Sequence, residues 1–304
     1  MSRWSAPQRP MAAVLMLLST QLAVGACRRV PADDPVASAA ATARSSPLVV
    51  PLRAPPDSAI PEGPLGTSIR RGHALLVATR DSLPDYVGNR LRCVSCHLDD
   101  GRRAYASPLV GVYARFPQYR ARNARVNTIE DRINGCFLRS MNGRPLPLEG
   151  RDIHDITAYL AWISRGIPVG ATVKGQGFVK LQPLPPDTVR GAASYASICA
   201  RCHGAQGEGT VLAPPLWGPQ SFNIGAGMAR LRTAAAFIRH NMPFDNPGSL
   251  TDQQAFDIAA YVVSRPRPDF PGKENDWPHG DAPPDAAYPT NGASAHRTAA
   301  TRQR

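Results

Sequence analysis

One short motif, present twice, constrains the fold of this 304-residue chain more than any other feature. The motif is Cys-x-x-Cys-His, which reads CVSCH at 93–97 and CARCH at 199–203. Each copy is followed by a stretch with apolar residues at helical spacing, at 155–168 and at 257–268. The chain therefore contains an internal duplication, with two similar stretches of about 100 residues.

Cys-x-x-Cys-His is the attachment signature of c-type heme. The two thiols form thioethers with the porphyrin, and the histidine becomes the proximal ligand of the iron. One helical turn places both sulfurs and the imidazole at the same edge of the ring. A Cys-x-x-Cys pair alone also suits a redox disulfide or half a zinc site, but the histidine that follows in both copies favours heme. We expect two covalently bound heme c groups, on Cys93, Cys96 and His97 and on Cys199, Cys202 and His203.

Helical patterns surround both motifs, whereas strand-like alternation is nearly absent. Residues 68–79 and 188–198 are candidate helices before the motifs, and residues 155–168 and 257–268 are candidate helices at the ends. A domain of this size with a helix at each end resembles class I cytochromes c. We predict a mainly α fold, with two tandem class I cytochrome c-like domains that each carry one covalent heme.

A Pro-Leu pair follows each motif, in SPLVG at 107–111 and in PPLWG at 214–218. Class I cytochromes place at this point a proline whose carbonyl accepts a hydrogen bond from the proximal imidazole. Such a bond orients the ring and tunes the iron. We expect one in each half.

The N-terminus is typical of an exported lipoprotein. Residues 1–26 combine a basic start with an apolar run that is too short to span a membrane. The run ends in Val-Gly-Ala-Cys, which resembles a lipobox and predicts lipidation of Cys27; the alternative is ordinary cleavage that leaves Cys27 as a free thiol. The predicted location is the periplasm, with the membrane reached through the N-terminal lipid.

Proline-rich segments suggest where the domains begin and end. After the signal peptide, we predict a flexible tether at 27–64, a first cytochrome c domain at 65–182 and a second at 183–270. Residues 271–304 are predicted to be a Pro-rich and polar tail that is disordered after about residue 290.

The net charge is +12, and 32 of the 35 basic residues are arginine. Nine of these arginines lie between residues 102 and 144, where only Glu130 and Asp131 oppose them. Export argues against nucleic acid as the partner. A basic surface that is merely solvated is the alternative, but the local excess favours a binding site for a small anion.

Each heme iron also needs a distal ligand. In the second half Met242 lies 39 residues after His203, just before a proline, which is the common distal context in this fold. Met228 begins an apolar pattern that is more typical of a core helix, and His240 is the other candidate. We predict His203 and Met242 as the ligand pair of the second heme.

The same count in the first half ends on a cysteine. Cys136 lies 39 residues after His97 and corresponds in position to Met242. The alternatives are that Met141 or His154 binds the iron, or that Cys136 is an ordinary buried thiol. The matched spacing favours His97 and Cys136 as the ligand pair of the first heme.

The residues around this cysteine form a helical pattern. Residues 128–131 have the spacing of a capping box, and Asn142 with the following glycine ends the pattern, which predicts a helix at 129–141. Arg132, Cys136 and Ser140 then lie on one face.

A thiolate ligand lowers the potential of a heme iron, whereas methionine raises it. Electrons are therefore expected to pass from the first heme to the second. Cys136, when it leaves the iron, is a nucleophile that nearby guanidinium groups activate. The first heme is thus the expected place of chemistry.

The segment at 116–147, FPQYRARNARVNTIEDRINGCFLRSMNGRPLP, and FPGKENDW at 270–277 resemble diheme thiosulfate dehydrogenases of the bacterial periplasm. The similarity covers about residues 60–288. It implies that two thiosulfates join to tetrathionate with release of two electrons, and that the reverse is possible. It also implies His/Cys ligation of the active-site heme by His97 and Cys136, and further roles for Arg122, Arg132 and Ser140.

The resemblance implies a mechanism in which Cys136 carries a sulfur-linked thiosulfate that a second thiosulfate attacks. The electrons would pass to a periplasmic or membrane acceptor, either a cytochrome or a high-potential iron protein. Some family members have a lysine beside the distal methionine and exchange ligands on reduction. Here that neighbour is Asn241, which predicts plain His/Met ligation.

Three other functions fit parts of the sequence. A non-catalytic diheme electron-transfer cytochrome explains the hemes but not the shared face of Arg132, Cys136 and Ser140. A sulfur-oxidation cytochrome that attaches thiosulfate to a carrier protein also uses a thiolate-ligated heme. A diheme peroxidase needs a distal acid/base group that the sequence does not reveal.

Overall fold

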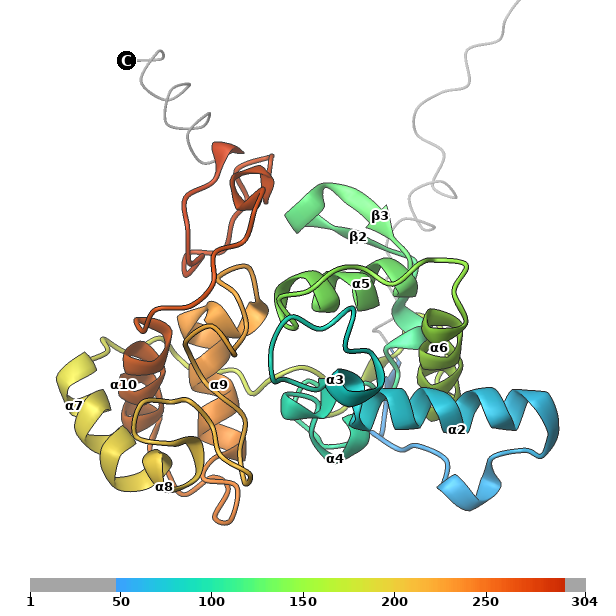
Figure 1. Ribbon diagram of the computed structural model, residues 1–304, viewed down its shortest axis with the longest axis horizontal. Helices are drawn as coiled ribbons and strands as arrows, with labels where there is room; N and C mark the ends of the chain where they lie inside the picture. Colours follow the sequence, from blue (N-terminus) through green and yellow to red (C-terminus); the bar gives the residue numbers. More distant parts are fainter. Residues whose placement is uncertain (1–47, 293–304) are drawn as a thin grey trace, which may run out of the picture. The chain divides into compact units, whose positions relative to one another are not determined.

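The computed structural model describes residues 48–292, so the predictions for the signal peptide, Cys27 and the end of the tail lie outside the described residues. Helices dominate (Figure 1). The helices of the first half are α2 (Gly63–Val77), α3 (Thr79–Ser82), α4 (Leu98–Gly101), α5 (Ile129–Arg139) and α6 (Arg151–Ile163). Those of the second half are α7 (Thr188–Ser194), α8 (Ala200–His203), α9 (Leu231–Asn241) and α10 (Asp252–Val263), with a π-helix, Tyr195–Cys199, between α7 and α8.

Strands are few and short in the described part of the chain, as the sequence predicts. β1 (Val49–Val50) pairs in parallel with β4 (Thr172–Val173). β2 (Gln118–Arg120) pairs in antiparallel register with β3 (Arg125–Asn127), so that Arg120 lies opposite Arg125. None of the helices in residues 48–292 has the length and apolar character needed to cross a bilayer.

The two halves repeat the same helix crossing. α2 packs on α6 in the first half, and α7 packs on α10 in the second. A glycine lies at each crossing: a Cβ on Gly72 would be 1.9 Å from the carbonyl oxygen of Asp155, and a Cβ on Gly191 would be 2.0 Å from that of Asp257. Both aspartates are buried and accept hydrogen bonds from arginine. The equivalent geometry supports the duplication read from the sequence.

Alanine at either glycine is therefore expected to push the crossing helices apart. We predict that Gly72→Ala and Gly191→Ala each lower the free energy of unfolding by about 1–3 kcal/mol. Chemical denaturation of the holoprotein, followed by helical circular dichroism, measures the change. Gly227→Ala is the control, because its Cβ meets no atom within 4 Å; equal effects at all three positions would contradict the prediction.

The tether predicted up to residue 64 does not hold for residues 48–62. In addition to the β1 pairing, the side chains of Leu52, Ala54 and Ile60 pack against the core of the first half. Apolar residues between the prolines of this segment give it side chains that can be buried. Its overall composition, rich in proline, does not predict this packing.

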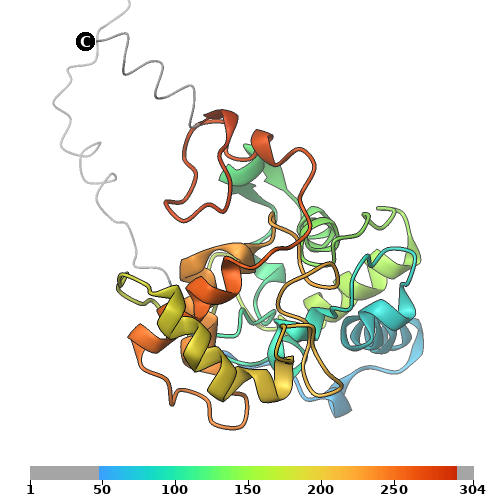
Figure 2. The same ribbon diagram turned by 60° about the vertical axis from the view of Figure 1, so that its left-hand side comes forward.

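The first part of the predicted C-terminal tail, up to residue 292, packs against the rest of the chain. We call residues 269–292 the C-terminal strap. Trp277 and Tyr288 are buried in it, and the buried Asp276 forms an ion pair with Arg139 of α5. Both views show the strap beside the β2–β3 ribbon (Figures 1 and 2), and Trp277 donates its backbone N–H to the carbonyl of Arg122 at 2.7 Å.

The two halves also share a core. Phe222, between the second motif and α9, belongs to the same buried cluster as Phe137 of α5. The side-chain amide of the buried Asn89 donates to the carbonyl oxygens of Ser140 at 2.8 Å and Ser221 at 3.0 Å. The loop at 220–226 is thus fixed against the end of α5.

Candidate active site

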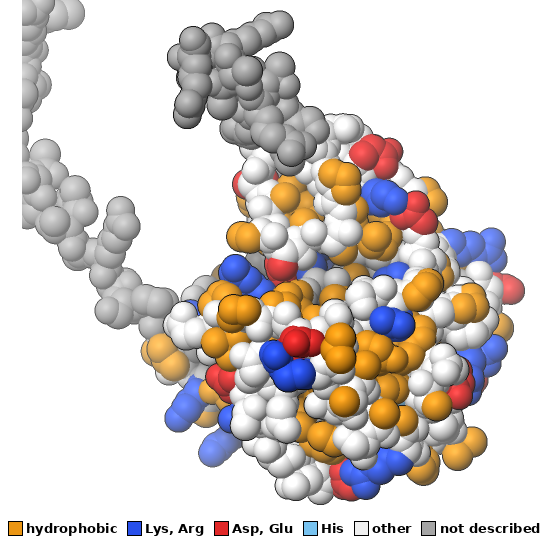
Figure 3. All heavy atoms as spheres, turned by 90° about the vertical axis from the view of Figure 1, so that its left-hand side faces the viewer, with side chains coloured by type: hydrophobic (Ala, Val, Ile, Leu, Met, Phe, Trp, Pro, Cys, Tyr) orange, Lys and Arg blue, Asp and Glu red, His pale blue; other side chains and the backbone are white. Residues whose placement is uncertain are grey.

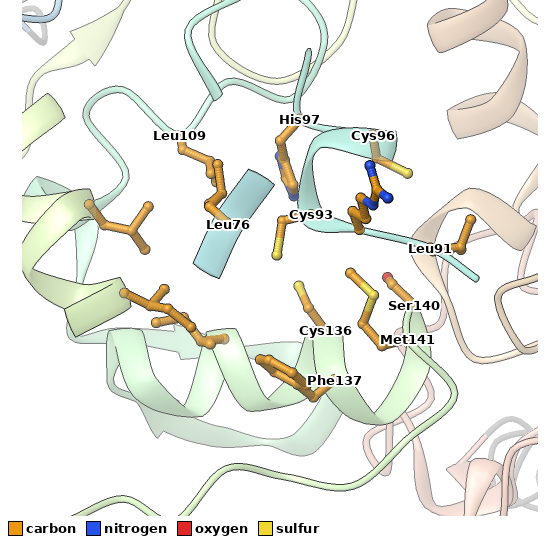
Figure 4. Close-up of a pocket in the computed structure, with 14 residues that line it drawn as sticks. Leu76, Leu91, Cys93, Cys96, His97, Leu109, Cys136, Phe137, Ser140 and Met141 are labelled. Carbon is orange, nitrogen blue, oxygen red and sulfur yellow. The ribbon is translucent and has the colours of Figure 1, made fainter. Parts of the chain in front are cut away.

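The first motif lines an apolar cavity. Cys93, Cys96 and His97 face it from one side, and Cys136 on α5 faces it from the other (Figure 4). The space between is lined by hydrophobic side chains, among them Leu76, Leu109, Ile133, Phe137 and Leu160. The two thiols, the imidazole and the opposing sulfur are the donor set that a covalent heme requires, so these residues fit heme c.

A backbone carbonyl orients the proximal imidazole in each half. The Nδ1 atom of His97 is 2.6 Å from the carbonyl oxygen of Ser107, and that of His203 is 2.8 Å from the carbonyl oxygen of Pro214. A proline is therefore the acceptor only in the second half. In both halves the acceptor is the residue before the Pro-Leu pair, because its carbonyl is the one turned toward the ring. The bond leaves Nε2 free to bind iron.

The helix that carries Cys136 begins at Ile129 as predicted and ends at Arg139, two residues before the predicted end. The Thr128 hydroxyl accepts from the backbone N–H of Asp131 at 3.2 Å, and the Asp131 carboxylate accepts from that of Thr128 at 3.0 Å. Ile129, Ile133 and Phe137 bury one face. Cys136 is next to that face and points into the cavity.

Charge distinguishes Cys136 from the other thiols of this cavity. Burial raises its pKa, but the guanidinium of Arg132, whose Nη1 donates to the sulfur at 2.8 Å, and the nearby His97 together lower that pKa to about 6. Burial instead raises the pKa of Cys93 and of Cys96 to about 12. Cys136 is therefore the sulfur that these surroundings favour as a thiolate.

A second, larger cavity adjoins the first, and Cys96, His97, Cys136 and Ser140 line both. Its wall is strongly basic and includes the side chains of Arg120, Arg122, Arg125, Arg132, Arg139 and Arg230. The sulfur of Cys136 thus lies where an apolar cofactor cavity meets a cationic one.

Arg122 lines this larger cavity but is held by neighbours. Its Nη1 donates to the carbonyl of Gly225 at 2.5 Å, and its guanidinium lies over the Trp277 ring at 4.5 Å. Burial, together with the charge of Arg139, lowers the pKa of Arg122 to about 10. The strap therefore fixes this predicted site residue in the cavity wall.

Gly135 also lines the larger cavity, and a Cβ there would meet no protein atom within 4 Å. Packing within the described residues thus gives no reason for glycine at this position. The sequence-based explanation, close approach to a porphyrin, stays a prediction.

In the second half, Met242 follows α9 and packs in a small cluster with Leu98 and Phe237. The preceding Asn241 is fully buried and donates to the carbonyl oxygens of Tyr105 at 3.2 Å and Phe237 at 3.1 Å. The segment with the proposed distal ligand thus contacts the loop that follows the first motif.

The alternative ligand candidates differ in where they lie, and only Met141 of them lines the first cavity. His240 makes an edge contact with Tyr105, and Met228 lies in a short 3-10 helix that lines the larger cavity. Met141 is buried beside Cys136 and lines the first cavity, whereas His154 is exposed on α6.

Family models match both halves. Residues 88–169 match "SoxA/TsdA, cytochrome c domain", and residues 186–262 match "Cytochrome C oxidase, cbb3-type, subunit III". Both matches lie inside the domains predicted at 65–182 and 183–270. The chain therefore consists of two cytochrome c domains with two covalently bound heme c groups, which confirms the predicted fold class and cofactors.

Similar whole proteins are also found. The thiosulfate dehydrogenase of Psychrobacter arcticus is 44% identical over 84% of this chain and 80% of its own length, and that of Allochromatium vinosum is 48% identical over 74% and 87%. The structure of the thiosulfate dehydrogenase TsdBA from Marichromatium purpuratum, in its as-isolated form, is 44% identical with a TM-score of 0.69. That match covers 72% of this chain and 50% of the solved one.

Proposed function

Since this chain belongs to the thiosulfate dehydrogenase family, as a diheme cytochrome that oxidises thiosulfate, we propose that its product is tetrathionate. Two thiosulfates would join through their outer sulfurs and release two electrons, and the reverse is possible. The observation that carries the proposal is the Cys136 sulfur, which lies between the heme-type cavity and a basic cavity with Arg132 bonded to it.

We assign the first heme to Cys93, Cys96 and His97, with Cys136 as its distal ligand. The second heme is assigned to Cys199, Cys202 and His203, with Met242 as its distal ligand and no lysine exchange at Asn241. The matched spacing of 39 residues in the two halves supports both distal assignments. The hemes, when bound, accept the two electrons of the reaction and pass them on.

The chain's own residues then divide the work. Arg132 stabilises the thiolate of Cys136, which forms a sulfur–sulfur bond to the outer sulfur of one thiosulfate as two electrons leave. Arg122 and Ser140 would contribute charge and a hydrogen bond for the sulfonate oxygens. The outer sulfur of a second thiosulfate attacks the bound one, the bond to Cys136 breaks, and tetrathionate leaves with the thiolate restored.

We propose that electrons leave through the second heme to a periplasmic or membrane acceptor, a cytochrome or a high-potential iron protein. Val189, Val211 and Leu212 of the second half are largely exposed. Hydrophobic side chains lie among charged ones on the face that Figure 3 shows. Such a mixed surface suits a transient redox partner.

Replacement of Met242 tests the exit heme. Because methionine raises the potential of a heme iron, Met242→Ala is expected to lower the potential of one heme and leave the other unchanged. Redox titration followed by absorbance measures both. Met228→Ala is the matched control. A heme potential that is lowered in Met228→Ala but unchanged in Met242→Ala would refute the assignment.

We propose that the protein is periplasmic and anchored by a lipid on Cys27. The sequence Val-Gly-Ala-Cys at 24–27 supports this. Cell fractionation with a labelled fatty acid tests it, and a Cys27→Ala variant that still carries label and stays in the membrane fraction would contradict it.

The central test is turnover with product analysis. The holoprotein should reduce an artificial acceptor with thiosulfate and produce one tetrathionate for two thiosulfates. An electron-transfer cytochrome would show no turnover. An enzyme that attaches thiosulfate to a carrier protein would need that carrier and produce little tetrathionate.

A further inference from the structure

We propose that Arg120 and Arg230 form a second oxyanion subsite, which holds the attacking thiosulfate beside the one on Cys136. This inference rests on the proposed function and deepens it. Arg120 ends β2 in the first half, and Arg230 precedes α9 in the second. Both line the larger cavity, together with Arg132 and Cys136.

These two arginines lack partners, unlike others in the same wall. Arg139 pairs with Asp276, and Arg125 with Asp131. In the described part of the chain, neither Arg120 nor Arg230 has a side-chain hydrogen bond or ion pair, and the Nε–H of Arg230 is buried without an acceptor. An unsatisfied buried donor is costly, so a group that fills this space must accept hydrogen bonds.

The charges in this cavity favour an anion. Burial lowers the pKa of Arg120, and the charges of Arg132, Arg115 and Arg230 lower it further. Cys136 opposes this effect, and the other acidic group that lines the cavity, Asp131, is engaged with Arg125 and the cap of α5. Mutually repelling guanidinium groups become stabilising when a dianion binds between them.

The reaction needs a second group of cations. Arg132 already donates to the Cys136 sulfur, where the first thiosulfate becomes bound. The second thiosulfate carries two further negative charges and must approach that negatively charged adduct. Arg120 and Arg230 would hold its sulfonate while its outer sulfur attacks, and because Arg230 belongs to the second domain, the subsite is incomplete in the first domain alone.

The discharge of the adduct isolates this step. The holoprotein is loaded on Cys136 with excess tetrathionate, which is then removed, and thiosulfate is added at increasing concentrations without an electron acceptor. Intact mass reports the loss of the adduct. We expect Arg120→Gln and Arg230→Gln to raise the half-saturating thiosulfate concentration at least about tenfold, with partial rescue by Arg120→Lys and Arg230→Lys.

Arg115→Gln is the matched control. Arg115 is an exposed neighbour that adds positive charge near Arg120 but does not line the cavity, so its variant should discharge like the wild type. The subsite proposal is wrong if Arg120→Gln and Arg230→Gln leave the half-saturating thiosulfate concentration unchanged. It is also wrong if Arg115→Gln raises that concentration as much as they do. If the wild type itself forms neither adduct nor tetrathionate, the proposed function fails instead.

Discussion

Cys136→Ala is expected to abolish thiosulfate oxidation, with a loss of at least about 10³-fold in kcat/KM. The variant lacks the sulfur that carries the first thiosulfate, and neither the guanidinium of Arg132 nor the hydroxyl of Ser140 can form the sulfur–sulfur bond in its place. It also lacks the proposed thiolate ligand of the first heme, so one heme potential should rise. Steady-state kinetics measure the loss of kcat/KM. Optical and paramagnetic resonance spectra report the loss of the thiolate ligand, and redox titration of the same preparation measures the heme potentials.

Two control variants separate the chemistry from the coordination. Cys136→Met offers the first iron the ligand type proposed for the second, so it should restore a six-coordinate spectrum without restoring turnover. Met141→Ala removes the neighbouring sulfur that lines the same cavity and should keep most of the activity. The proposed role of Cys136 is wrong if Cys136→Ala retains wild-type turnover. It is also wrong if the spectrum of thiolate ligation is lost in Met141→Ala but kept in Cys136→Ala.

The sequence predicts the parts of this site that depend on local spacing. The heme motifs, the helix that begins at Thr128 and the shared face of Arg132 and Cys136 all follow from short-range rules, because one turn of helix relates their residues. The duplication extends these rules, because the spacing between motif and distal residue in one half predicts the corresponding position in the other. The comparisons confirm the two-domain cytochrome c fold and the family.

The sequence does not predict the contacts that close the site. Arg230 reaches the cavity from the second half, and Asp276 reaches α5 from the strap. Arg230 and Asp276 follow Cys136 by 94 and 140 residues in the sequence, and hydrophobic periodicity does not predict contacts at such separations. A composition rich in proline and polar residues also suggests a tail, although Trp277 and Tyr288 are buried. The aromatic residues of the strap are the sequence feature that could have predicted this packing, because aromatic side chains tend to be buried.

Replacement of Asp276 has the second large expected effect, because this carboxylate joins the strap to the site. It is buried, with 5% of its surface exposed, and accepts two hydrogen bonds from Arg139, at 2.8 and 2.9 Å, and one from the Tyr288 hydroxyl. Asp276→Ala leaves the guanidinium of Arg139 without its counter-charge next to Arg122. Loss of one partner of a buried pair typically costs 3–5 kcal/mol; because Arg139 keeps some exposure, we expect a loss of about 3 kcal/mol in the free energy of unfolding.

Asp269→Ala is the matched control, because it removes a carboxylate of the same strap that is largely exposed and forms its ion pair with Lys273, and it should leave the stability nearly unchanged. Denaturant unfolding of both holoproteins measures the difference. Since Trp277 of the strap also holds Arg122, Asp276→Ala should raise the KM for thiosulfate, and limited proteolysis should cut the strap sooner. Equal stabilities of the two variants would show that the carboxylate of Asp276 does not anchor the strap.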